Sequence, residues 1–238
     1  MVKSNDKTKQ AQMSLNHSLV GVNNLKDLST SSEPDTAFAL LQLSIALLDA
    51  ALDILIEHIH TDKQLQHQST LMPGGTPGKH FRHVIEMFKA FTLPLQPYAR
   101  DPPEGPLEIN YDSILPSSRK YVAKSVSTCR KALKDVRNEL EAWGKRSKAG
   151  TGALAKEMSR PVILVAVTPT RQEMASSVGR ELWFCSLHAI HHFSMLRAIA
   201  VHELGLDLPV EFGTAPSTLL YRDKNRQQPG AVRAKGKL

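Results

Sequence analysis

Four of the ten histidines of this 238-residue chain lie between His188 and His202, in the otherwise apolar stretch ELWFCSLHAIHHFSMLRAIAVHE. Imidazole is the most common side-chain ligand of metals in proteins. On a helix, His188 and His192 lie one turn apart on the same face, so both rings can approach one ion. Two rings do not make a site, and a third ligand has to come from another element. The alternative is that these rings are core residues bonded to backbone or carboxylate groups.

A second segment offers such a ligand. In TPGKHFRHVIEMFKAF, residues 76 to 91, apolar residues recur at spacings of three and four, Thr76 is a good N-cap and Pro77 suits the first turn. His80 and His83 lie among these apolar residues, so either ring could face the same core as the later pair. Metal sites in helical bundles are built in this way, from side chains on facing helices. The spacing alone leaves the choice between His80 and His83 open.

The elements that position these residues are predicted to be four helices. The first follows the Ser-Glu-Pro-Asp sequence at residues 32 to 35 and runs to about residue 60, and the second ends before Pro94. The third covers residues 117 to 146, and the last begins after Ser176 or Ser177 and runs to residue 204, where Gly205 stops it.

The segments between these helices differ in character. Residues 94 to 116 hold six prolines and cannot form a regular helix or a central strand, so we expect a long crossover. Residues 148 to 160 are predicted to be a flexible loop, and residues 161 to 177 a small β-hairpin. We therefore expect a mainly α fold, a helical bundle over residues 34 to 222, with a disordered segment at 1 to 33 and a basic disordered tail at 223 to 238.

Composition limits the class of protein. A hydrophobic content of 41% is enough for a sizeable core, and two cysteines, Cys129 and Cys185, are too few for a disulfide framework. The most apolar segment, residues 37 to 56, is interrupted by polar and acidic residues, so we interpret it as a core helix and not as a membrane span. We expect a cytoplasmic protein, with a weak similarity of the final Gly-Lys-Leu to a peroxisomal signal.

The formal charge of +7 raises the question of nucleic acid. Basic residues outnumber acidic ones mainly in two regions, residues 119 to 160 and 222 to 238. Few aromatic residues are interleaved with these charges, so we interpret them as a solvated helix face and a tail. Nucleic acid is not an expected partner.

Several motifs carry a resemblance to a known family. The stretches GKHFRHVIEMFKAF, INYDS, VGRELWFCSLHAIHHFSMLRAI and LPVEFGTAPSTLLYRD, in this order, resemble the DinB-like (YfiT-like) superfamily over roughly residues 36 to 222. The resemblance implies an up-down-down-up four-helix bundle that holds a divalent ion, commonly zinc or nickel. By position, it implies His83, His188 and His192 as the ligands. His80 is the neighbour of the implied ligand, and His191 points about 100° away from His192, so we expect it to support the site or to pack in the bundle.

The resemblance also gives an expectation for the activity. Three neutral imidazoles leave the charge of an ion uncompensated and one position open, so a bound water or thiol becomes more acidic. Members of the superfamily include thiol-dependent transferases. We expect a metal-dependent transferase, or a hydrolase-like enzyme, that uses a low-molecular-weight thiol on a small electrophilic substrate. The alternative is a non-catalytic bundle stabilised by metal, acting as a structural or stress-related binding module. A homodimer is a further expected form, and no membrane partner is expected.

Four other residues are weaker candidates. Glu181 lies seven residues before His188 on the same face, where it could orient a ligand ring, act as a base, or pair with a basic group such as Arg180. Cys185 could be a soft ligand or a reactive thiol, although inert packing is the reading we favour. Tyr111 and Asp112 resemble a family motif near the mouth of the bundle, and we expect them either to support the site residues or to lie on the substrate side of the site.

Overall fold

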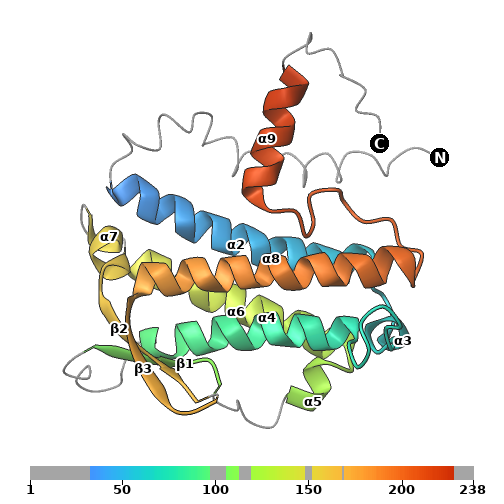
Figure 1. Cartoon of the computed structure of the whole chain (residues 1–238), viewed down its shortest axis with the longest axis horizontal. Coiled ribbons are helices and arrows are strands. Elements are labelled where there is room, and N and C mark those ends of the chain that lie inside the picture. Colours follow the sequence, from blue (N-terminus) through green and yellow to red (C-terminus); the bar gives the residue numbers. More distant parts are fainter. Residues whose placement is uncertain (1–32, 97–105, 113–118, 148–151, 168, 228–238) are drawn as a thin grey trace.

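The computed structural model describes residues 33–96, 106–112, 119–147, 152–167 and 169–227. Its framework is four long helices, and each of them packs on two of the others (Figure 1). These helices are α2 (Glu33–Glu57), α4 (Pro77–Thr92), α6 (Val126–Arg146) and α8 (Val178–His202). The contacts join α2 to α6 and α8, and they join α4 to α6 and α8. The prediction of a mainly α fold is confirmed.

Helix α2 is the most apolar element. Its residues Thr36–Glu57, with a mean hydropathy of 2.0, are long and apolar enough to cross a membrane by length and composition. In the structure α2 packs on α6 and α8, with Leu41, Leu48 and Leu55 buried. Ser44 of α2 and Ser186 of α8 are both buried and their hydroxyl oxygens lie 2.8 Å apart, so one donates to the other, and each also lies within hydrogen-bond distance of a carbonyl of its own helix. Helix α2 thus contributes one part of its surface to the core, with 39% of its most apolar stretch buried.

Helix α4 begins as its sequence predicts and is held by a neighbour that the sequence did not predict. Thr76 is its N-cap and accepts a hydrogen bond from the Lys79 backbone N–H, and a 3₁₀ turn, η2 (Leu93–Leu95), follows its end. Gly78 lies against the backbone of Ala123, and a Cβ atom at position 78 would come 2.1 Å from the Ala123 carbonyl oxygen. This contact fixes the start of α4 against the turn that precedes α6.

The single helix predicted for residues 117 to 146 is in fact two. A short helix, α5 (Arg119–Val122), precedes α6, and the chain turns between them. Ser125 adopts an extended conformation and accepts a hydrogen bond from the Thr128 backbone N–H, so it caps a new helix. Tyr121, in the short helix α5, is 68% exposed and does not join the buried face of α6. The break is what allows Ala123 to meet α4.

The small sheet has three strands in the order β1-β2-β3. The predicted hairpin is confirmed, since β2 (Pro161–Ala166) and β3 (Gln172–Ser177) pair antiparallel. The crossover contributes one more strand, β1 (Leu107–Asn110), which pairs parallel to β2 with Leu107 opposite Val162. Expecting a hairpin alone was therefore wrong. A four-residue strand between prolines has too short a pattern to be recognised, and only its pairing with β2 identifies it.

Two short helices lie in the connections between the long helices. Helix α3 (Asp62–Leu65) starts with a capping box between Thr61 and Gln64. Helix α7 (Ala153–Met158) lies in the segment predicted to be flexible, where Leu154 and Met158 are buried against the core. Helices this short are stabilised by tertiary packing and not by their own propensity, so the sequence pattern did not reveal them.

Beyond α8 the chain folds back and then leaves the bundle. Gly205 ends α8 with a positive φ of 64°, and Phe212 stacks on Phe193 with ring centroids 4.8 Å apart. Helix α9 (Pro216–Gln227) follows and projects away from the long helices (Figure 1), so helical structure continues past the predicted boundary at residue 222. Of the predicted disordered segment at 1 to 33, residues 1–32 lie outside the described residues, while Glu33 begins α2. Most of the crossover and residues 228–238 also lie outside them.

Candidate metal centre

Helices α4 and α8 lie side by side and bring three of the predicted residues together (Figure 1). The Nε2 atom of His83 lies 2.9 Å from Nε2 of His188, which in turn lies 3.1 Å from Nε2 of His192. One ligand atom from each of the three rings lies within 4.8 Å of the other two. His83, His188 and His192 therefore form one cluster, which we call the histidine cluster.

The structure places His80 and His83 differently, although the sequence left them equivalent. His80 contacts the nitrogen of His192 that faces away from the other two rings: its Nδ1 atom lies 2.9 Å from Nδ1 of His192. The Nε2 atom of His192 faces His188 instead. The two nitrogens of an imidazole point in diverging directions, so His80 cannot share an ion that is bound to Nε2 of His192.

His191 lies at the edge of the cluster. It is exposed, and its ring centroid is 6.0 Å from that of His188 and 5.4 Å from that of His192. No hydrogen bond joins His191 to the cluster among the described residues. His191 therefore lies on the surface beside the cluster and not in the core, and no described hydrogen bond lets it position a ligand ring.

The environment of the cluster favours neutral rings. Burial is the larger cause, and the neighbouring imidazole of His83 the second, of a pKa lowered to about 4 for His188 and to about 3 for His192. Burial followed by the charge of His83 also lowers the pKa of His80. A histidine binds a metal only in its neutral form. At neutral pH both rings of α8 are thus in the form that a metal requires.

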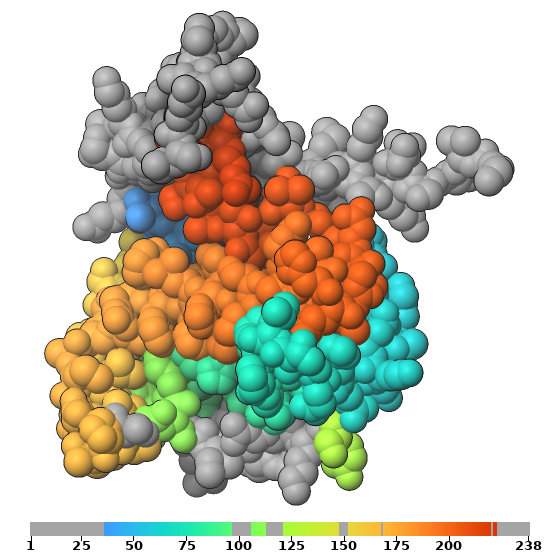
Figure 2. All heavy atoms as spheres, turned by 45° about the vertical axis from the view of Figure 1, so that its right-hand side comes forward, coloured from blue at the N-terminus to red at the C-terminus, as the bar shows by residue number. Residues whose placement is uncertain are grey.

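The cluster lies near the surface and not in the middle of the core. His83 and His188 are half-buried, and His192 is at least partly buried. Figure 2 shows α8, in orange, at the molecular surface next to the segment from α3 to α4, in cyan and teal. The partial exposure of His83 and His188 leaves one side of the cluster in contact with solvent.

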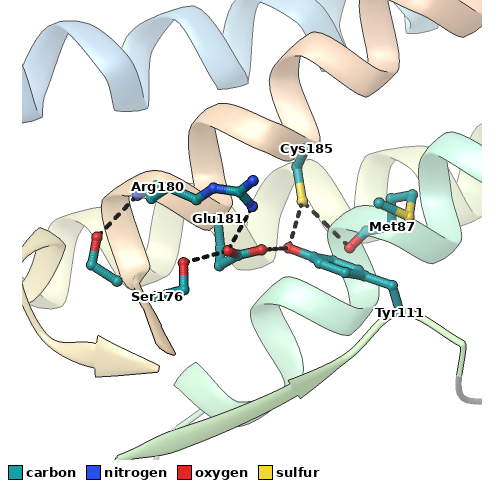
Figure 3. Close-up of polar contacts among 7 residues, drawn as sticks. Met87, Tyr111, Ser176, Arg180, Glu181 and Cys185 are labelled. Carbon is teal, nitrogen blue, oxygen red and sulfur yellow. Dashed lines mark hydrogen bonds and ion pairs between the residues drawn. The ribbon is translucent and has the colours of Figure 1, made fainter. Parts of the chain in front are cut away.

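Glu181 belongs to a separate polar cluster two turns before His188, shown in Figure 3. Its carboxylate is fully buried and accepts three hydrogen bonds, from the Tyr111 hydroxyl at 2.9 Å, the Ser176 hydroxyl at 2.5 Å and the Arg180 guanidinium at 2.8 Å. No described contact joins Glu181 to the histidine cluster. Of the roles open to it from the sequence, the geometry matches the ion pair with Arg180 and gives it no ring to orient.

Cys185 is packed between the two clusters. Its thiol lies 3.4 Å from the Tyr111 hydroxyl oxygen and 3.8 Å from the Met87 carbonyl oxygen, to which it donates (Figure 3). Burial raises the pKa of this thiol to about 12, so it is protonated at neutral pH. The sulfur is not among the ligand atoms that converge in the histidine cluster. Cys185 therefore has the inert packing role that we favoured from the sequence.

Tyr111 and Asp112, at the end of β1, have different neighbours. The ring of Tyr111 packs on Phe184 with centroids 5.4 Å apart, and Phe184 packs on His188 with centroids 5.6 Å apart. Burial is the main cause of a raised pKa for the Tyr111 hydroxyl, which stays protonated and donates to Glu181. Asp112 accepts the Val167 backbone N–H at 2.8 Å and joins the ends of β1 and β2.

Phe184 also lies next to the site, although it was not predicted from the sequence. It connects Tyr111 to the histidine cluster through two ring contacts. Its position four residues before His188 was the available signal, since residues at this spacing meet on one helix face.

Comparisons with known proteins add one relative. The chain is similar to FK506-binding protein 5 of Rhizopus delemar (strain RA 99-880), with 27% identity over 192 residues, which cover 77% of this chain. The match spans only 38% of that relative, so its name describes a much longer protein. No family model matches the chain, and no solved structure matches it.

Proposed function

We propose that the protein holds one divalent metal ion, zinc or nickel, on His83, His188 and His192, and that it is a metal-dependent transferase. Its substrates would be a low-molecular-weight thiol and a small electrophilic molecule. The observation that carries this proposal is the convergence of three Nε2 atoms from two helices, at distances of 2.9 Å and 3.1 Å. The fold fits the DinB-like bundle that the sequence resembles, because the four long helices pack in a closed ring.

The three rings fit a zinc-sized ion. In a tetrahedral site with zinc–nitrogen distances of about 2.0–2.1 Å, the ligand nitrogens lie about 3.3 Å apart. The two separations from Nε2 of His188, 2.9 Å and 3.1 Å, are slightly shorter, and all three ligand atoms lie within 4.8 Å of one another, so small rotations of the rings would give the spacing that an ion needs. Without an ion, each Nε2 atom carries either one proton or one lone pair, so Nε2 of His188 can pair with only one of its two neighbours. This is a physical reason for a cation at their centre.

The number of ligands favours catalysis over a purely structural ion. Structural zinc sites have four protein ligands, whereas catalytic sites have three and leave one position for water or substrate. Within the described part of the chain, no fourth histidine, cysteine or carboxylate joins the cluster. The half-buried His83 and His188 leave this position open to solvent. A metal that only stabilised the bundle would not need such an opening.

The chemistry follows from this arrangement. An ion bound here would lower the pKa of a thiol at its open position, so that the thiol reacts as a thiolate. The rings of His83, His188 and His192 would hold the reacting centre at the α4–α8 surface without adding negative charge. Phe184 and Tyr111 would provide an apolar wall beside it, because their rings continue from His188 towards β1. The Glu181 carboxylate accepts three hydrogen bonds and is fully buried, so we assign it no proton transfer.

The experiment is metal analysis by mass spectrometry on tag-free protein. Wild type is expected to bind about one zinc or nickel per chain, and His83→Ala, His188→Ala and His192→Ala are each expected to lose it while circular dichroism shows that they stay folded. His202→Ala, an exposed histidine in the last turn of the same helix, is the matched control and should keep the metal. Metal-free wild type after supplementation with both ions would refute the proposal.

A second measurement separates enzyme from structural protein. Metal-loaded wild type is incubated with glutathione, cysteine or other small thiols and an electrophilic test substrate, and loss of the free thiol is followed. Turnover that disappears in His188→Ala supports the transferase. A protein that binds metal and gains thermal stability from it, but consumes no thiol in any combination, would instead support the non-catalytic alternative.

A further inference from the structure

Among the described residues, the ring of His80 has one hydrogen-bonding partner, and that partner is a proposed metal ligand. Its Nδ1 atom lies 2.9 Å from Nδ1 of His192, and the ring centroids are 5.2 Å apart. The other nitrogen of His80, Nε2, is buried and has no hydrogen-bond partner among the described residues. The polar interactions of this ring are therefore directed only at His192.

This contact bears on which nitrogen of His192 carries the proton. A neutral imidazole has one N–H and one lone pair, and the hydrogen bond made by one nitrogen determines the role of the other. Nε2 of His192 faces His188 and the rest of the histidine cluster, so this atom needs the lone pair if it is to bind an ion. Nδ1 must then carry the proton, and Nδ1 of His80 is the acceptor for it.

The surroundings of His80 hold its ring in place. A turn formed by residues 69–75 lies against its far side, where a Cβ atom at Gly75 would come within 3.3 Å of Nε2 of His80. The turn is closed by hydrogen bonds from the Ser69 N–H to the Gly75 carbonyl and from the Gly75 N–H to the Met72 carbonyl. The same Cβ would lie 2.9 Å from the Met72 carbonyl oxygen, closer than a Cβ approaches a backbone oxygen, so the turn requires glycine at this position.

The same turn is tied to the end of α8. The Glu203 carboxylate accepts hydrogen bonds from the Thr70 N–H at 2.7 Å, the Thr70 hydroxyl at 2.5 Å and the Leu71 N–H at 3.0 Å. The helix that carries His192 thus also holds the turn that packs on His80. The ring of His80 is enclosed between this turn and His192.

We propose that His80 is a positioning residue for the metal centre, which keeps His192 in the tautomer protonated at Nδ1 and directs its Nε2 atom at the ion. The inference rests on the proposed metal site, and it assigns His80 a role outside the ligand set. Hydrogen-bond partners of metal-ligating histidines typically account for a factor of about 10 to 100 in metal affinity. Because the acceptor is a neutral ring and not a carboxylate, it orients His192 without reducing the charge of the ion.

The first measurement is zinc affinity by competition with a chromophoric chelator, for wild type, His80→Ala, His80→Asn and His191→Ala. His80→Ala is expected to bind zinc about 10 to 100 times more weakly. His80→Asn keeps an oxygen acceptor close to the place of Nδ1 and should recover most of that loss. His191→Ala removes an exposed neighbouring ring that makes no hydrogen bond to His192 among the described residues, and should bind as wild type does.

Two spectroscopic readouts separate positioning from simple packing. In the cobalt-substituted protein, the visible absorption bands should change in His80→Ala and return towards wild type in His80→Asn. In the zinc-loaded, ¹⁵N-histidine-labelled wild type, long-range ¹H–¹⁵N spectra should show His192 protonated at Nδ1.

The outcomes distinguish this inference from the site on which it rests. If wild type binds zinc and His83→Ala does not, but His80→Ala binds as tightly as wild type, the role of His80 is refuted and the metal site stands. Protonation of His192 at Nε2 in the zinc form would refute it as well. If wild type binds neither zinc nor nickel, the proposed function and this inference fall together.

Discussion

Replacing Glu181 tests the separate polar cluster at the start of α8. The carboxylate is fully buried and joins three segments, because its donors are Tyr111 after β1, Ser176 in β3 and Arg180 in α8 (Figure 3). Glu181→Ala removes the common acceptor of all three. The Tyr111 hydroxyl is then left with only the Cys185 thiol as a polar neighbour among the described residues.

The loss of stability in Glu181→Ala depends on which of the three donors can form a hydrogen bond to water instead. The side chain of Arg180 is 56% exposed, so solvent can replace much of its lost ion pair. Tyr111 is the buried donor, and a buried polar group without a partner costs about 1–3 kcal/mol. Adding the lost hydrogen bonds to a charged acceptor, we expect Glu181→Ala to lower the free energy of unfolding by about 3–5 kcal/mol. Glu181→Gln, which keeps the shape and one acceptor oxygen, should cost about 1–2 kcal/mol.

The assay is urea unfolding followed by circular dichroism, with EDTA present so that metal binding does not contribute. Tyr111→Phe and the double variant Tyr111→Phe/Glu181→Gln complete a double-mutant cycle, in which we expect a coupling of about 1 kcal/mol or more. A free energy of unfolding for Glu181→Ala within about 1 kcal/mol of wild type would refute this role of Glu181. So would simple addition of the effects of Tyr111→Phe and Glu181→Gln in the double variant.

Three further predictions follow from other residues. Burial and two neighbouring carboxylates raise the pKa of Asp53 to about 6, so folding favours its protonated form and this contribution to stability is lost between about pH 4 and pH 6. In urea unfolding, Asp53→Asn should therefore increase the free energy of unfolding at pH 8 more than at pH 4, by no more than about 1 kcal/mol because the group is half-exposed. Burial raises the pKa of Cys129 and of Cys185 to about 12, so a thiol reagent at pH 8 should modify neither in the native state and both after unfolding in urea. In urea unfolding, Gly78→Ala should lower the free energy of unfolding by about 2 kcal/mol or more, because the new Cβ would meet the Ala123 backbone at 2.1 Å. Gly152→Ala, whose Cβ would have nothing within 4 Å, should show only the smaller cost of its positive φ.

Local sequence signals located most of the framework correctly. Thr76 with Pro77 marks the start of α4, and Ser177 and Gly205 mark the two ends of α8. Each of these signals acts over a few residues, through a capping hydrogen bond or an allowed backbone conformation, and so it can be read without knowing the fold. Signals that depend on distant partners were missed. The α5–α6 break and strand β1 exist because Ala123 meets Gly78 and Leu107 pairs with Val162.

The sequence by itself determined that His188 and His192 share a helix face, because a spacing of four residues fixes their relation whatever surrounds them. It also brought forward His80 and His83 as the two rings available on a second helix. Only the tertiary structure decided between them. The packing of α4 on α8 turns Nε2 of His83 towards His188 and places His80 next to Nδ1 of His192. The same packing, with the sheet against the start of α8, gave Glu181 its three donors and separated it from the histidine cluster. These relations join residues up to 112 positions apart in the chain, and no local pattern encodes the direction in which such side chains meet.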